Sequence, residues 1–97
     1  MIVKLETKLE RGFAPWKSML KENSAKLKEH EMAIIYAGTA KDDDNSMTVI
    51  IDFASEEGMK NFAADEDSIA KRVAGGVLMD TVVMTQMMDI FVTNFAG

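Results

Sequence analysis

The chain has 97 residues, the size of a single domain, and 47% of them are hydrophobic, a composition that excludes intrinsic disorder. It contains no cysteine, which excludes disulfides, thiolate catalysis, iron–sulfur clusters and cysteine zinc sites. The net charge of −5 disfavours nucleic acid and membrane surfaces as partners, and with no apolar leader or spanning stretch we expect a cytoplasmic protein.

The first part of the chain predicts a strand, a helix and a second strand. Residues 2–9 alternate between apolar and charged side chains, which is the period of a strand. Pro15 suits the first turn of a helix, and apolar residues then recur at helical spacing, so we expect one helix over 14–29. Residues 33–40 are rich in β-branched and aromatic side chains and predict the second strand.

The next part predicts a hairpin followed by helical structure. A polar turn over 41–46 joins the second strand to a third at 47–53, and strands joined in this way pair antiparallel. Ser55 is placed to cap the helix that follows. The acidic run 65–68 breaks or re-caps this helix, and its second piece ends at Gly75-Gly76.

The last strand is expected over 81–92, and it is apolar on both faces. The resulting order of elements is that of a ferredoxin-like β-α-β-β-α-β domain, an α+β fold with a four-stranded antiparallel sheet and its helices on one face. The open face would then expose Ile50 or Ile51 together with a row of the last strand, either Val82, Met84 and Met88 or Val83 and Met87. Soluble proteins avoid exposing an apolar patch of that size, so we expect a homodimer that pairs through this face.

This arrangement resembles the dimeric α/β-barrel superfamily, in which two ferredoxin-like chains pack sheet to sheet. The segment Phe13-Ala14-Pro15-Trp16, the strand around Gly38 and the turn Asp42–Asp44 are similar to small uncharacterised bacterial members. The resemblance implies a dimer. The superfamily includes heme-independent monooxygenases of the antibiotic-biosynthesis type, dehydratases and stress-induced proteins. A shared fold does not define the reaction.

Charged residues of the first strand form one candidate site. Lys4 and Glu6 face away from the apolar side of their strand, toward what would be the interior of the barrel. Asp52, on the neighbouring strand, is expected within reach of either. A buried carboxylate beside a lysine has a shifted pKa, so Glu6 and Asp52 are candidate catalytic residues and Lys4 a candidate ligand-binding residue. The alternative is that these side chains reach solvent at the edge of the barrel.

His30 is the only histidine, and it stands between two glutamates at the end of the first predicted helix. Flanking carboxylates favour an imidazole that changes its charge near neutral pH, so His30 is a candidate catalytic residue. The alternative is a cation that complements the helix dipole.

Trp16, Tyr36 and Met84 are candidate ligand-binding residues. The two aromatic rings could stack on a planar ligand, although core packing also explains Trp16. The nine methionines suit adaptable interface packing better than a soft-metal site, because successive residues of a strand face opposite ways. We therefore expect no metal and no cofactor.

Two functions fit the sequence. In the first, a homodimer holds a small, partly apolar molecule between sheet and helices, for binding or for a cofactor-free reaction. Oxygenation of an electron-rich aromatic is the reaction that the resemblance suggests. In the second, a non-enzymatic structural or interaction dimer fills its barrel with methionine, isoleucine and phenylalanine side chains.

Overall fold

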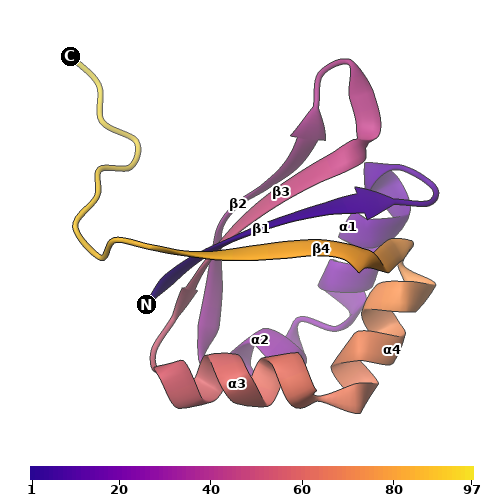
Figure 1. Cartoon of the computed structure of the whole chain (residues 1–97), viewed down its shortest axis with the longest axis horizontal. Helices are drawn as coiled ribbons and strands as arrows, with labels where there is room; N and C mark the ends of the chain where they lie inside the picture. The colour runs from indigo at the N-terminus through magenta and orange to yellow at the C-terminus, as the bar shows by residue number, and fades with distance from the viewer.

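A four-stranded antiparallel sheet carries all four helices on one of its faces (Figure 1). The computed structural model describes all 97 residues. In chain order the elements are β1 (Ile2–Leu9), α1 (Phe13–Glu22), α2 (Ala25–Glu29), β2 (Met32–Ala40), β3 (Asp43–Phe53), α3 (Glu56–Ala64), α4 (Glu66–Ala74) and β4 (Val77–Met87). The strands are ordered β2-β3-β1-β4, which confirms the predicted ferredoxin-like fold with each of its two helices divided.

The core lies between the sheet and the helices, as the burial pattern of β3 shows. Its alternate side chains point toward the helices and are at most 3% exposed: Met47, Val49, Ile51 and Phe53. Trp16 of α1 and Phe62 of α3 close this layer from the helix side. Burial of this apolar surface is the main favourable term in folding.

The helix predicted over 14–29 is in fact two helices, so that prediction was wrong at its centre. The backbone N–H of Asn23 and its side-chain Nδ2 both donate to the carbonyl oxygen of Met19, at 3.0 and 2.9 Å. Ser24 follows, and α2 starts after it. Asparagine and serine bond to nearby backbone in non-helical conformations, which explains why the chain turns here.

The predicted break in the second helical region is confirmed. Asp65 ends α3 and caps α4, because its Oδ1 accepts from the N–H groups of Asp67 at 3.1 Å and Ser68 at 3.2 Å. Ser55 caps α3 as expected, its Oγ accepting from the N–H of Gly58 at 3.0 Å. Each cap satisfies helical donors that otherwise have no partner.

The strands of the hairpin and the last strand differ from their predicted bounds. The hairpin turn is shorter than expected, because β3 already begins at Asp43, which pairs with Ala40. The last strand, predicted over 81–92, spans Val77–Met87 instead. Met87 pairs with Ile2, the first residue of β1, so later residues have no strand to pair with.

The face of the sheet away from the helices mixes apolar and charged side chains. The strand register aligns one row of residues across this open face: Tyr36, Ile50, Lys4 and Thr85. The next row holds Gly38, Thr48, Glu6 and Val83. Of the alternatives left by the sequence, the register places Ile50, Val83 and Met87 on this face.

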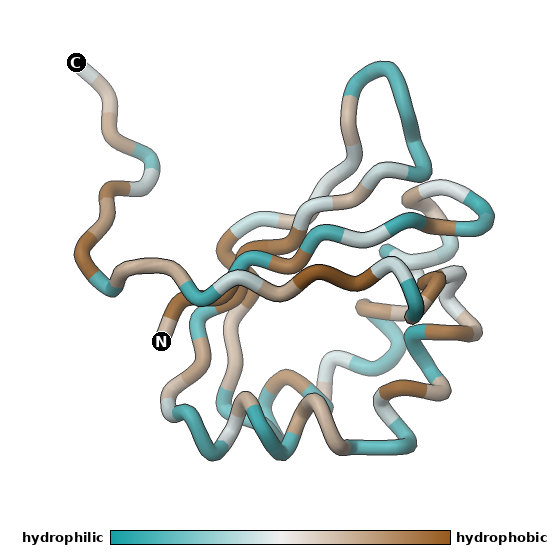
Figure 2. Tube along the Cα trace, in the orientation of Figure 1, coloured by the Kyte–Doolittle hydropathy of each residue, from teal (hydrophilic) through white to brown (hydrophobic).

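Residues 88–97 leave the sheet as an extended segment without secondary structure (Figure 1). Much of this segment is hydrophobic, in contrast to the polar tip of the β2–β3 hairpin (Figure 2). None of the four helices has the length and apolar character that a membrane crossing requires.

Candidate functional site

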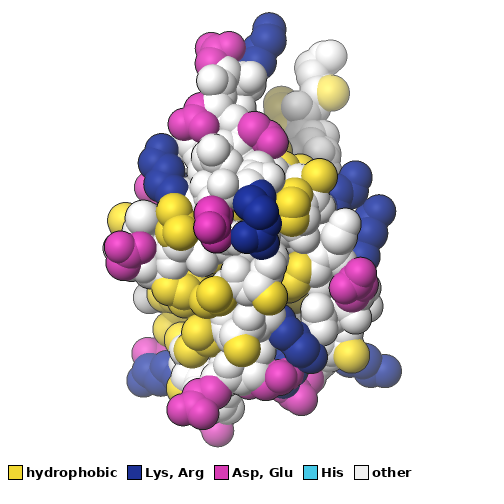
Figure 3. Space-filling view, turned by 90° about the vertical axis from the view of Figure 1, so that its right-hand side faces the viewer, with side chains coloured by type: hydrophobic (Ala, Val, Ile, Leu, Met, Phe, Trp, Pro, Cys, Tyr) yellow, Lys and Arg dark blue, Asp and Glu magenta, His cyan; other side chains and the backbone are white.

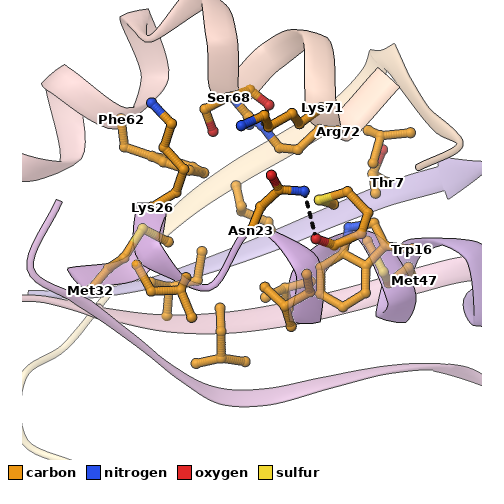
Figure 4. Close-up of a pocket in the computed structure, with 18 of the residues that line it drawn as sticks. Thr7, Trp16, Asn23, Lys26, Met32, Met47, Phe62, Ser68, Lys71 and Arg72 are labelled. Carbon is orange, nitrogen blue, oxygen red and sulfur yellow. Dashed lines mark hydrogen bonds between the residues drawn. The ribbon is translucent and has the colours of Figure 1, made fainter. Parts of the chain in front are cut away.

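A cavity of about 80 Å³ lies between the sheet and the helices (Figure 4). Its hydrophobic lining residues are Leu5, Trp16, Met19, Leu20, Leu27, Met32, Ile34, Met47, Val49, Ile51, Phe62, Val77 and Val82. The polar ones are Thr7, Asn23, Lys26, Ser68, Lys71 and Arg72. On the surface that Figure 3 shows, hydrophobic side chains gather in groups between charged ones. Apolar walls with a few polar groups are the usual form of a small-molecule site.

The cavity is narrow for an aromatic ligand. An apolar cavity of about 150 Å³ accommodates benzene, so a ring enters this one only if side chains of the wall move. Met19, Met32 and Met47 belong to that wall, and the unbranched methionine side chain adapts its shape readily. A ligand would therefore widen the cavity as it binds.

Two lysines that line the cavity are held by carboxylates. Lys26 Nζ lies 2.8 Å from Asp65, 3.1 Å from Glu29 and 3.2 Å from Asp67, and Lys71 Nζ lies 3.1 Å from Asp67. The hydrogen bond to Asp65 raises the pKa of Lys26, and the same bond holds the pKa of Asp65 well below its usual range. The hydrogen bond from Lys71 likewise lowers the pKa of Asp67. The positive charge of each lysine is therefore balanced by the carboxylates that it contacts.

Arg72 differs from the two lysines because no carboxylate bonds to it. Its guanidinium carbon lies 4.4 Å from the centroid of the Phe62 ring, and its Nε donates to the carbonyl oxygen of Ser68 at 3.3 Å. Its Nη2 is buried and has no hydrogen-bond partner. Burial lowers the pKa of Arg72, yet an arginine stays charged at neutral pH. Arg72 thus brings a positive charge and a free donor to a mostly apolar space.

His30 lies beside the cavity but does not line it. Its Nε2 is 2.8 Å from Asp65 Oδ2 and 3.1 Å from Glu29 Oε2, and its ring meets Phe62 edge-on, with 5.6 Å between the centroids. The three groups Glu29, His30 and Asp65 could hold a metal ion by spacing alone. However, Lys26 Nζ already contacts the same two carboxylate oxygens, so a cation occupies this position. His30 therefore adds a hydrogen bond to the ion-pair cluster of Lys26, Glu29 and Asp65, which joins α2 to the start of α4.

Of the residues predicted to bind a ligand, Trp16 alone lines the cavity. It is 5% exposed, and its ring stacks on Phe13 with 5.6 Å between the centroids, so it serves the core as well. Met84 of β4 lies beside Leu5 of β1 but is 44% exposed and outside the cavity. Tyr36, 53% exposed, lies on the open face of the sheet.

The predicted charged group of the first strand also lies on the open face, away from the cavity. Lys4 Nζ contacts Glu6 Oε1 at 3.8 Å. Asp52 does not pair with either residue, because the register places it opposite Ile2, and its partner is the amino group of Met1 at 3.4 Å. The ion pairs of Asp52 and of Lys4 are thus made with other partners, and a site formed by these residues inside a barrel stays a prediction.

Sequence reasoning missed the polar residues of α4. Ser68 and Arg72 are four positions apart on one helical face, and Arg72 is three positions after the apolar Ile69. A basic residue in phase with the apolar side of a short helix was the available signal. That signal does not show which residue the arginine side chain would cover, because the contact of Arg72 with Phe62 arises only when α4 packs against α3.

The fold is shared with solved structures of bacterial proteins that include a cofactor-independent oxygenase and a proposed antibiotic biosynthesis monooxygenase, which confirms the predicted resemblance at the level of the fold. No protein-family model matches the sequence, and no curated protein matches it either.

Three solved structures are similar over nearly the whole chain. Protein Atu4242 from Agrobacterium tumefaciens has a TM-score of 0.65 at 13% identity, covering 99% of this chain and 100% of its own. SnoaB, a cofactor-independent oxygenase from Streptomyces nogalater, has a TM-score of 0.56 at 12% identity, covering 92% and 94%. A proposed antibiotic biosynthesis monooxygenase from Deinococcus radiodurans has a TM-score of 0.59 at 10% identity, covering 100% of both chains. At these identities the similarity shows a common fold and nothing further.

Proposed function

We propose that this chain works as a homodimer and binds a small, partly apolar molecule in the cavity between its sheet and its helices. The observation that carries the proposal is a mostly apolar cavity whose lining includes a few polar groups. Unfilled space in a core is destabilising, and so is a buried polar group without a partner, such as Nη2 of Arg72. A site that receives a ligand gives both features a purpose. The absence of cysteine supports a reducing compartment such as the cytoplasm.

Dimer formation through the open face is supported by the apolar side chains that remain exposed. Val83 and Met87 lie on this face at 55% and 42% exposure, and Ile90 and Phe95 of the C-terminal segment are exposed by more than four fifths. Monomeric proteins seldom leave so much apolar surface in water, and a second copy of the same face is the simplest cover. The charged and aromatic residues predicted as site residues would then lie inside the barrel: Lys4, Glu6, Tyr36 and Asp52.

A cofactor-free oxygenation is a second candidate, favoured by the fold shared with SnoaB, a cofactor-independent oxygenase. Such a reaction needs a base to deprotonate an electron-rich aromatic. The cavity lining contains no carboxylate, histidine or tyrosine, and His30 contacts the lining residue Phe62 without lining the cavity itself. The lining therefore supports binding more directly than catalysis.

Thermal-shift screening with planar, partly apolar molecules tests the binding proposal. A ligand present at 100 times its Kd stabilises the folded state by about 2.7 kcal/mol. This corresponds to a rise of roughly 10–20 °C for a domain of this size. The variant Val82→Phe, which places a ring in the wall of the cavity, should lose the shift. If no compound raises the midpoint, the non-enzymatic structural dimer is the better reading.

Sedimentation at micromolar concentration tests the dimer separately. A homodimer has twice the chain mass of 10.7 kDa. If the protein sediments solely as a 10.7 kDa species, the dimer proposal is refuted.

A further inference from the structure

The three cations of the cavity are not equivalent. Lys26 and Lys71 are each held within 3.2 Å of a carboxylate, whereas Arg72 has no such partner. The Phe62 ring and the carbonyl oxygen of Ser68 fix the guanidinium in place and leave Nη2 without an acceptor. In a chain with a net charge of −5, a partly buried guanidinium to which no carboxylate is hydrogen-bonded needs an explanation.

We propose that Arg72 recognises an oxyanion of the bound molecule, so that the ligand is a small apolar acid. This inference rests on the proposed function, because it takes the cavity as a ligand site. The ligand would carry a carboxylate or an ionised phenol at one end and an apolar body at the other. The oxyanion accepts from Nη2, and the body lies against the methionine and aliphatic walls.

The strength of the contact follows from its surroundings. A hydrogen bond between an arginine and a carboxylate is charge-assisted and about twice as strong as a neutral one. Little water competes for Nη2 because the atom is buried, and the low dielectric strengthens the attraction further. Phe62 and Ser68 hold the guanidinium before the ligand arrives, so little side-chain entropy is lost on binding.

The competing explanation is that Arg72 is purely structural and covers Phe62 with its stem. The unliganded variant Arg72→Met distinguishes the two, because methionine retains apolar contact with Phe62 but removes the buried charge. A structural arginine predicts a lower unfolding midpoint for this variant. An arginine kept for a ligand predicts a midpoint equal to or above that of the unsubstituted chain, since the unpaired buried donor is gone.

The binding test uses benzoate and benzamide, which have nearly the same shape and differ in charge. The chain has one tryptophan, and Trp16 lines the cavity, so its indole N–H gives a single NMR signal that reports on the site. Methyl signals of Met19, Met32 and Met47 report on the wall. Titrations would compare the unsubstituted chain with Arg72→Met, Arg72→Lys and the control Lys17→Met, which removes an exposed charge from α1 outside the cavity.

Benzoate should bind at least tenfold more tightly than benzamide, and Arg72→Met should abolish this preference while Lys17→Met leaves it unchanged. Arg72→Lys should retain part of it. Equal binding of both probes would overturn the role of Arg72 and leave the cavity as a site. A benzoate preference that survives in Arg72→Met would also overturn it. If neither probe moves the Trp16 signal, the proposed function fails, and this inference fails with it.

Discussion

Replacing Val49 by isoleucine should stabilise the unliganded protein. Val49 is 3% exposed at the centre of β3 and faces the cavity, and isoleucine keeps the β-branched shape that strands favour. At about 24 cal/mol per Å³, the 80 Å³ cavity corresponds to roughly 2 kcal/mol of lost packing. One added methylene group recovers about 0.8 kcal/mol of that. The unfolding midpoint should therefore rise by about 3–6 °C.

Val3→Ile is the matched control for this substitution. Val3 lies in β1 and is fully buried, but it does not line the cavity. The same methylene group overpacks that position and should cost about 1–3 kcal/mol. Thermal unfolding followed by circular dichroism measures both variants, and the Val49 variant should also bind ligands more weakly. If Val49→Ile lowers the midpoint as Val3→Ile does, the cavity offers no usable space and the reasoning is refuted.

Three further predictions follow from contacts elsewhere in the chain. Ser55→Ala removes the cap of α3 and should lower the free energy of unfolding by about 1 kcal/mol in urea titrations, whereas Ser55→Gly should cost only a few tenths. Because Lys26 and His30 hold the pKa of Asp65 below its ordinary 3.8, its stabilising contribution is present above that value and is lost as the pH falls toward the lower folded-state pKa. Asp65→Asn should flatten the fall in urea midpoint on acidification from about pH 5, and an unchanged slope would count against the ion-pair cluster. Val83→Lys on the open face should yield a monomer in sedimentation, while Val73→Lys, at a similarly exposed position on α4, should leave the dimer intact.

The fold could be predicted from the sequence because its signals are local. Alternation in residues 2–9 and a cap at Ser55 each indicate an element without knowledge of its neighbours. The ends of the strands were less predictable where the length of the neighbouring strand limits the pairing. β4 stops at Met87 because β1 starts opposite it, and no pattern within the apolar run 81–92 records that limit.

The site was harder to predict because its residues come together only in the folded chain. Charged residues on a regular strand, such as Lys4 and Glu6, attract attention in a sequence, yet they lie on the open face of the sheet. Arg72 has the appearance of an ordinary surface cation at the end of a helix. Its burial depends on Phe62, ten positions earlier on a different helix, and on the angle at which Asp65 joins the two.

The two-residue period of β3 separates the proposed binding site from the proposed dimer interface. Val49 faces the cavity, and Ile50, its immediate neighbour, faces the open side of the sheet. The sheet is therefore one wall of the ligand site and, on its other side, the surface that would meet a second chain. A ligand that widens the cavity must either move side chains of the helices or bend the strands of the sheet. In the first case binding and dimerisation are independent, and in the second each changes the other by the same factor.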